Sequence, residues 1–268
     1  MQAPATRESS IEAEERSGPP AGPTHHSTVP LAGAWACLYN RGLDPKPHTA
    51  PPTLMRPLRL LHAIALATLF ALAAIVPARA EPSAPVVLVV GDSISAAYGL
   101  APGAGWVELL SARLAKERYP HRVVNASITG DTTAGGRARL PALLERYKPS
   151  VVVLELGGND GLRGGDLGST RDNLATMVEA AQRAGAKPLI VGMQIPPNYG
   201  GAYVRQFSAL FAEVAKAHKA PLVPFFFEGF GERNEMFQPD RVHPTAAAQP
   251  LLVDNVWPKL VPLLGKPR

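Results

Sequence analysis

The sequence predicts one α/β domain, a doubly wound three-layer α/β/α sandwich around five parallel strands. Five short runs of Val, Ile and Leu are apolar throughout, which is typical of strands buried on both faces of a parallel sheet. A segment with helical signals follows each run. The 268 residues carry no internal repeat, and 46% of them are hydrophobic, which is enough for one domain with its own core.

The five predicted strands end at glycine, proline or polar residues. The first, Pro-Val-Val-Leu-Val-Val, runs into Gly91-Asp92-Ser93, and the third runs into Gly157-Gly158-Asn159. In doubly wound sheets, functional residues gather at the carboxyl ends of the strands, so these two junctions are candidate site positions. The predicted strands span residues 85–90, 122–126, 150–156, 188–193 and 222–227.

The helical segments are amphipathic and lie between the strands. Gly135, Gly136 and Pro141 weaken the second of them, because glycine and proline disfavour a helix interior. Pro244 suits the first position of the last helix, where a missing N–H costs nothing. The predicted helices span residues 106–119, 132–147, 172–184, 203–218 and 244–264.

Residues 55–80 have the layout of a secretory signal peptide. A basic start precedes the apolar run 63–76, and Ala78-Arg79-Ala80 has the small-residue pattern of a cleavage site. The apolar run is shorter than the roughly 20 residues needed to span a membrane. We therefore expect cleavage after Ala80 and a mature domain of residues 81–268, periplasmic or secreted, with no stable membrane span.

The preceding residues 1–54 are rich in proline, serine, threonine and charge, which predicts a disordered extension. A signal peptide normally begins a chain, and this one begins at Met55. The alternative is therefore that Met55 is the true initiator and residues 1–54 are a mis-assigned extension.

Composition limits the partners. The formal charge of +5 is modest, and Lys and Arg are scattered, which does not favour nucleic acid. Cys37 is the sole cysteine, so no intramolecular disulfide is possible, and no Cys/His cluster predicts a zinc site. We expect a monomer that acts on a small molecule without a metal or cofactor.

Four motifs carry the candidate chemistry, and each taken alone has a plain structural explanation. Gly91-Asp92-Ser93 could be a tight turn with a helix cap, and the glycines of 125–132 and 156–161 could serve only to turn the chain. Asp240 and His243, three residues apart before Pro244, could be a helix cap and an exposed histidine. The combination of the four, each at a strand end or helix start, is far more specific.

In order and spacing the four motifs resemble those of the SGNH hydrolases, over residues 85–264. The segments G-D-S-I-S-A-A-Y-G-L, N-A-S-I-T-G-D-T-T, L-G-G-N-D-G-L-R-G and H-P-T-A-A-A-Q-P are similar to the periplasmic acyl-CoA thioesterase/lysophospholipase branch, often called arylesterases. The resemblance implies the SGNH hydrolase fold, with a flavodoxin-like five-stranded parallel sheet. One departure is Arg241, where relatives often have glycine.

By this resemblance Ser93 is the nucleophile, His243 the general base and Asp240 the residue that orients His243. The oxyanion hole would comprise the backbone N–H groups of Ser93 and Gly130 and the side-chain amide of Asn159. These residue types suit acyl transfer: a serine hydroxyl needs a base, and imidazole can accept and return a proton near neutral pH. The absence of a G-x-S-x-G sequence argues against the α/β-hydrolase fold.

The predicted substrate is a small acyl, aryl or lysophospholipid ester or thioester. Apolar residues near the motifs could line an acyl trench or simply pack the core, and the glycine-rich segment 157–165 could be a loop that closes on substrate. The alternatives are a carbohydrate O-deacetylase of the same superfamily, an acyltransferase and a non-catalytic binding module. The candidate trench residues are Leu162, Ile195, Pro196 and Tyr199, with Met236 and Phe237 beside them.

Overall fold

A computed structural model describes residues 84–268 of the chain. The predicted extension 1–54, the signal peptide 55–80 and its cleavage site lie outside the described residues. Within them, five parallel strands form one sheet in the order β2-β1-β3-β4-β5. This is the flavodoxin-like order, which confirms the predicted fold class. The strands are β1 (Val86–Gly91), β2 (Arg122–Asn125), β3 (Val151–Glu155), β4 (Lys187–Val191) and β5 (Leu222–Val223).

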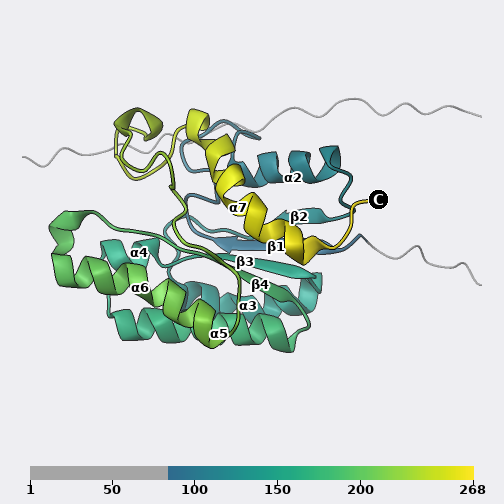
Figure 1. Cartoon of the computed structure of the whole chain (residues 1–268), viewed down its shortest axis with the longest axis horizontal. Coiled ribbons are helices and arrows are strands. Elements are labelled where there is room, and N and C mark those ends of the chain that lie inside the picture. Colours follow the sequence, from purple (N-terminus) through teal and green to yellow (C-terminus); the bar gives the residue numbers. More distant parts are fainter. Residues whose placement is uncertain (1–83) are drawn as a thin grey trace, which may run out of the picture. The chain divides into compact units, whose positions relative to one another are not determined.

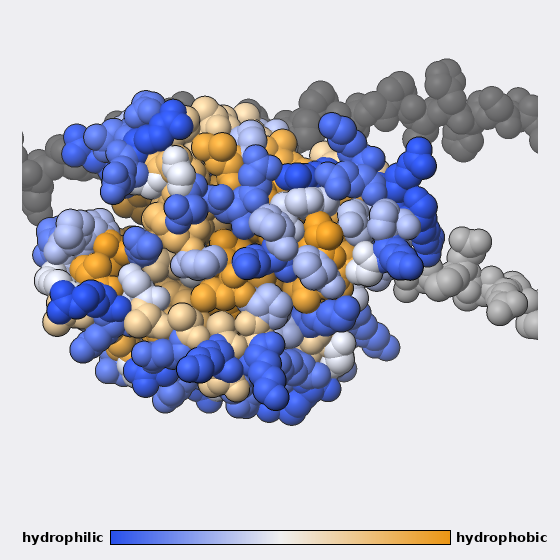
Figure 2. Space-filling model, in the orientation of Figure 1, coloured by the Kyte–Doolittle hydropathy of each residue, from blue (hydrophilic) through white to orange (hydrophobic). Residues whose placement is uncertain are grey.

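Helices cover both faces of the sheet (Figure 1). On one face α2 (Trp106–Lys116) packs against α7 (Gln249–Leu264). On the other, α3 (Thr133–Tyr147) packs against α5 (Leu167–Arg183), and α5 packs against α6 (Gly201–Ala217). Figure 2 shows hydrophilic side chains on the outer surfaces of the helices and hydrophobic ones between the layers, as expected of a sandwich with two covered faces.

The two central strands hold the middle of the core. All six residues of β1 and all five of β3 are buried, and Val87 to Gly91 pair in register with Val151 to Glu155. One of the buried positions is ionisable: Glu155, at the end of β3, is 2% exposed. Because the strands are parallel, the loops that follow β1, β2 and β3 emerge at the same edge of the sheet, which is where the sequence motifs fall.

The last helix begins later than predicted. Residues 243–245 are not helical, because their backbone groups pair with residues 236–238: Gln238 N donates to His243 O at 2.8 Å, and Thr245 N to Met236 O at 2.8 Å. A 3-10 turn over Ala246–Ala248 then leads into α7 at Gln249. Pro244 therefore belongs to a small antiparallel hairpin that holds His243.

Other elements also differ from the prediction. Strand β5 is only two residues long, because Pro224 has no N–H to continue the ladder. Helix α5 starts at Leu167, five residues earlier than expected, since the side chain of Asp166 caps it by accepting from Ser169 N. The glycine-rich segment 157–165 contains a short helix, α4 (Gly158–Leu162).

Candidate active site

Ser93 and His243 meet at the carboxyl edge of the sheet, although 150 positions separate them in sequence. Ser93 lies in the turn directly after β1 and is 7% exposed. The Nε2 atom of His243 lies 2.8 Å from its Oγ atom, a hydrogen-bonding distance. Across such a bond, an imidazole can remove the proton of a serine hydroxyl.

Asp240 holds the other side of the imidazole. Its Oδ2 lies 2.7 Å from His243 Nδ1, while its Oδ1 accepts from Val242 N at 2.9 Å and from His243 N at 3.0 Å. Partial desolvation raises the pKa of Asp240, but these backbone and ring contacts outweigh it and hold the pKa at about 2. An ionised carboxylate at this position keeps the proton of the neutral imidazole on Nδ1 and leaves Nε2 free to accept.

Two neighbours fix the position of the imidazole from other directions. The ring of Tyr98 lies 4.6 Å from that of His243, centre to centre, with a 41° tilt. Gln238 links the two segments, because its Nε2 donates to Tyr98 O at 2.8 Å and to Pro244 O at 3.3 Å. The histidine is thus held by its own hairpin and by the loop that carries Ser93.

The predicted oxyanion-hole residues come from three neighbouring segments, two turns and the short helix α4. Neither Ser93 N nor Gly130 N donates a hydrogen bond to any group within residues 84–268, so both donors are available to a ligand. Gly130 adopts a φ of +78°, a left-handed conformation that favours glycine. Asn159 lies in α4, and its amide reaches across to the loops that follow β1 and β2.

Arginine contacts hold the Gly130 loop in place. The guanidinium of Arg139 pairs with Asp131 at 2.8 Å and also donates to Ala126 O and, at 3.3 Å, to Gly91 O. Arg163, which follows α4, donates to Gly130 O at 3.1 Å. These contacts connect the ends of β1 and β2 to the helices, so the loop has support on both sides.

Beneath the nucleophile lies a buried acidic pair that the sequence interpretation did not assign. Asp92 and Glu155 are each 2% exposed, and Asp92 N lies 3.4 Å from Glu155 Oε2. Burial raises the pKa of Asp92 to about 6, against the lowering effects of Ile94 N, His243 and Asn159. Burial, and after it the charge of Asp92, raise the pKa of Glu155 well above its ordinary value.

Glu155 also belongs to a buried hydrogen-bond chain. Trp106 Nε1 donates to Ser95 Oγ at 3.1 Å, and Ser95 Oγ donates to Glu155 Oε2 at 2.6 Å. The chain connects α2, the Ser93 turn and the end of β3, and it fixes the turn from below. A glutamate at the end of an otherwise apolar strand was the sequence signal for it, because a buried carboxyl group needs partners.

The four predicted trench residues separate into two groups. Tyr199 and Pro196 are exposed, and Tyr199 Oη donates to the backbone oxygen of Leu162 at 2.9 Å. The side chain of Leu162 itself is partly buried against the core. Ile195 is buried and belongs to the core; a side chain at Gly161 would meet its Cγ2 atom at 3.0 Å. Only the first group could therefore touch a ligand without a rearrangement of the core.

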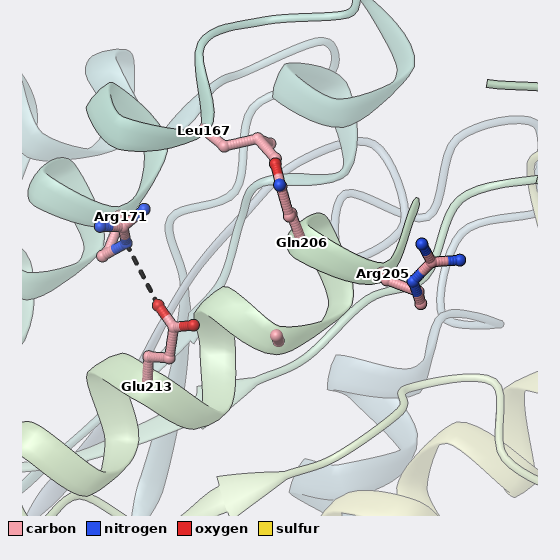
Figure 3. Close-up of a pocket in the computed structure, with 6 residues that line it drawn as sticks. Leu167, Arg171, Arg205, Gln206 and Glu213 are labelled. Atoms are coloured by element: carbon pink, nitrogen blue, oxygen red, sulfur yellow. Dashed lines mark ion pairs between the residues drawn. The ribbon is translucent and has the colours of Figure 1, made fainter. Parts of the chain in front are cut away.

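A separate cavity of about 310 Å³ lies away from these residues, at the facing sides of α5 and α6 (Figure 3). An ion pair between Arg171 and Glu213, 3.4 Å apart, crosses it. The cavity shares no residue with the Ser93–His243 site. Its lining residues are Leu167, Arg171, Arg205, Gln206, Ala209 and Glu213.

The fold and the Ser–His–Asp arrangement are those of a serine hydrolase, and comparison with known proteins gives its family. The chain belongs to the GDSL-like Lipase/Acylhydrolase family, whose profile matches residues 89–250. The expected SGNH/GDSL relationship is thereby confirmed, and the protein is a carboxylic ester hydrolase.

Three relatives place the chain within that family. It is 57% identical over 184 residues to Esterase TesA of Pseudomonas aeruginosa, covering 69% of this chain and 92% of the relative. It is 41% identical over 183 residues to Thioesterase 1/protease 1/lysophospholipase L1 of Escherichia coli K12, covering 68% and 86%. A crystal structure of TesA superposes with a TM-score of 0.66 at 58% identity, covering 67% of this chain and 99% of that one.

Proposed function

We propose that the protein hydrolyses acyl esters and thioesters through a covalent acyl-enzyme on Ser93. The contact between His243 Nε2 and Ser93 Oγ at 2.8 Å, with Asp240 at 2.7 Å from Nδ1, is the observation that carries the proposal. His243 removes the serine proton as Oγ attacks the acyl carbon, and Asp240 stabilises the imidazolium that forms. The acyl carbonyl oxygen takes the negative charge of the tetrahedral intermediate.

The oxyanion is then bound by Ser93 N, Gly130 N and the Asn159 amide. Donors aimed at an oxyanion act when charge develops, and removal of one typically costs about 100-fold to 1,000-fold in kcat. The imidazolium of His243 gives its proton to the leaving alkoxide or thiolate, which departs and leaves the acyl-enzyme. Water, deprotonated by His243, attacks the acyl-enzyme and releases the acid and Ser93.

A fluorophosphonate tests the nucleophile, because it forms a stable adduct only with an activated serine. Intact mass of the purified protein should show one stoichiometric adduct, which Ser93→Ala should lack. Ser208→Ala is the matched control, because it removes a hydroxyl that bonds within α6. An adduct that persists in Ser93→Ala, or its absence from well-folded wild-type protein, would contradict the assignment of Ser93.

For substrates we propose short to medium acyl chains on aryl, thioester or lysophospholipid leaving groups. The names of the relatives support thioesters and lysophospholipids. The exposed aromatic ring of Tyr199, whose hydroxyl donates to the backbone oxygen of Leu162 at the end of α4, supports contact with an acyl chain. A chain-length series of p-nitrophenyl esters tests this proposal: activity should extend to octanoyl esters, whereas activity on acetyl esters alone would favour a carbohydrate deacetylase.

We further propose export by the signal peptide 55–80, cleavage after Ala80 and a monomeric mature domain of residues 81–268. Within the described part of the chain, none of the helices is long and apolar enough to cross a membrane. N-terminal sequencing of the processed protein should begin at Glu81. In the natural precursor, a peptide from residues 1–54 would count against initiation at Met55. Sedimentation should give the mass of one chain.

A further inference from the structure

The amide of Asn159 is already held by two acceptors. Its Nδ2 donates to Asp92 Oδ2 at 3.1 Å and to the backbone oxygen of Asp131 at 2.9 Å. Both partners are acceptors, so the amide must face them with its nitrogen rather than its oxygen. Nδ2 has only two hydrogens, and an oxyanion must therefore share or replace one of these partners.

Asp92 accepts hydrogen bonds on both of its carboxylate oxygens. One carboxylate oxygen accepts from Asn159, and the other accepts from Ile94 N at 3.0 Å. An asparagine in its place could offer one acceptor and would turn its NH₂ group against the other donor. A protonated carboxyl group would accept more weakly at its hydroxyl oxygen than a carboxylate does. The two donors therefore suit the ionised acid best.

The surroundings of Asp92 explain how a buried carboxylate remains charged. Burial, and after it the charge of Asp131, raise the pKa of Asp92 to about 6. The hydrogen bond from Ile94 N, a protonated His243 and the Asn159 amide oppose this rise, and Arg139 offsets the charge of Asp131. Burial raises the pKa of Glu155 further than that of Asp92, so Glu155 keeps its proton and Asp92 carries the charge.

We propose that Asp92 is a positioning residue that holds the Asn159 amide in place as the oxyanion donor. The inference rests on the proposed function, because it assumes that Asn159 binds the oxyanion. A hydrogen bond to a charged acceptor is stronger than one to a neutral carbonyl. The Asp92 bond therefore persists during the reaction, and the hydrogen that faces Asp131 O is the one shared with the oxyanion.

A double-mutant cycle tests this role. Asn159→Ala should lower kcat by about 100-fold or more with little change in KM. Asp92→Asn should lower kcat by about 10-fold to 100-fold in the wild-type background, but by less than about 3-fold in the Asn159→Ala background. A general disturbance of the Ser93 turn would instead lower kcat by the same factor in both backgrounds, and that result would overturn the proposal.

The cycle also separates this proposal from the function on which it rests. If Asn159→Ala keeps full kcat, the oxyanion role of Asn159 fails, and the positioning role fails with it. If Asn159→Ala is slow and the two losses multiply, only the positioning role fails. Circular dichroism and thermal unfolding of each variant establish that the folded proteins are being compared.

A spectroscopic measurement covers the case in which Asp92→Asn does not fold. The side-chain NH₂ protons of Asn159 can be followed by NMR from pH 5 to 8 in His243→Gln, which removes the nearby imidazole as a second titrating group. The shifts should change with a midpoint at or above about 6, because loss of the imidazolium can only raise the pKa of Asp92. A titration of Asp92, followed at its own carboxyl carbon, that leaves the Asn159 shifts unchanged would overturn the proposal.

Discussion

Replacement of Asp240 by asparagine separates the role of its charge from its role in holding the loop. Oδ1 accepts from Val242 N and His243 N, and Oδ2 lies 2.7 Å from His243 Nδ1. In Asp240→Asn the amide oxygen should remain with the two backbone donors, which turns its NH₂ group toward Nδ1. The imidazole proton then moves to Nε2, where it faces Ser93 Oγ, and the base is blocked.

The magnitude follows from these contacts. To restore the active tautomer the asparagine must turn over, which costs two neutral hydrogen bonds, about 2 kcal/mol in total. Loss of the charge-assisted bond to the imidazolium costs about 2 kcal/mol more. The sum of about 4 kcal/mol predicts a fall in kcat of about 1,000-fold. A serine protease triad loses about 10,000-fold on the same change; Asp240 is 41% exposed, which favours a smaller loss because water can replace part of the contact.

Hydrolysis of p-nitrophenyl butyrate at pH 8 measures the effect, and ¹⁵N NMR of the imidazole reports the tautomer. Thermal unfolding should shift little, because the backbone contacts of Oδ1 remain. Asp254→Asn is the matched control: it removes a surface pair with Arg113 and should keep kcat within about 2-fold. A folded Asp240→Asn protein that loses less than 10-fold in kcat would refute the reasoning.

Three further predictions concern stability. Ser95→Ala removes the hydroxyl that bonds both Trp106 Nε1 and Glu155 Oε2, which should lower the free energy of unfolding by about 3 kcal/mol in total. Calorimetry should therefore show a fall in Tm of about 6–12 °C, and a fall under about 3 °C would contradict the prediction. In the wild-type protein the free energy of unfolding should fall as pH rises above 4.5, because the folded Glu155 carboxyl group keeps a proton that the unfolded chain releases. Glu155→Gln should make this fall smaller. Urea unfolding at pH 5 and 8 measures the fall, and an equal fall in both proteins would count against the prediction. Arg241 has a φ of +58°, a left-handed conformation that strains a non-glycine residue. Arg241→Gly should raise the free energy of unfolding, measured by urea titration, by about 0.5 kcal/mol, because release of this strain exceeds the entropy cost of glycine. A lower free energy of unfolding would argue against strain at this position.

Much of the architecture was predictable because its signals are local. Continuous apolar runs gave the positions of all five strands, although Pro224 shortened the last one to two residues. The predicted start of α7 was wrong, because a proline before a helical pattern can be either the first residue of the helix or part of the preceding loop. Only pairing with residues 236–238, which lie outside that pattern, shows that Pro244 belongs to a hairpin.

The buried network could not be predicted in the same way. The partners of Glu155 are Ser95 and Asp92, 60 and 63 positions away, and neither has a sequence pattern that points to the third strand. The glutamate itself was a signal that a polar partner must exist, but the partner's identity depends on which strands are neighbours.

The sequence by itself determined the order of strands and helices, the motif residues and the close pairing of Asp240 with His243, because each depends on residues a few positions apart. Only the tertiary structure decided that His243 reaches Ser93 across 150 positions and that Asp92 and Asp131 share the amide of Asn159. The physical reason is that parallel strands bring their carboxyl ends to one edge of the sheet, so loops distant in sequence become neighbours there.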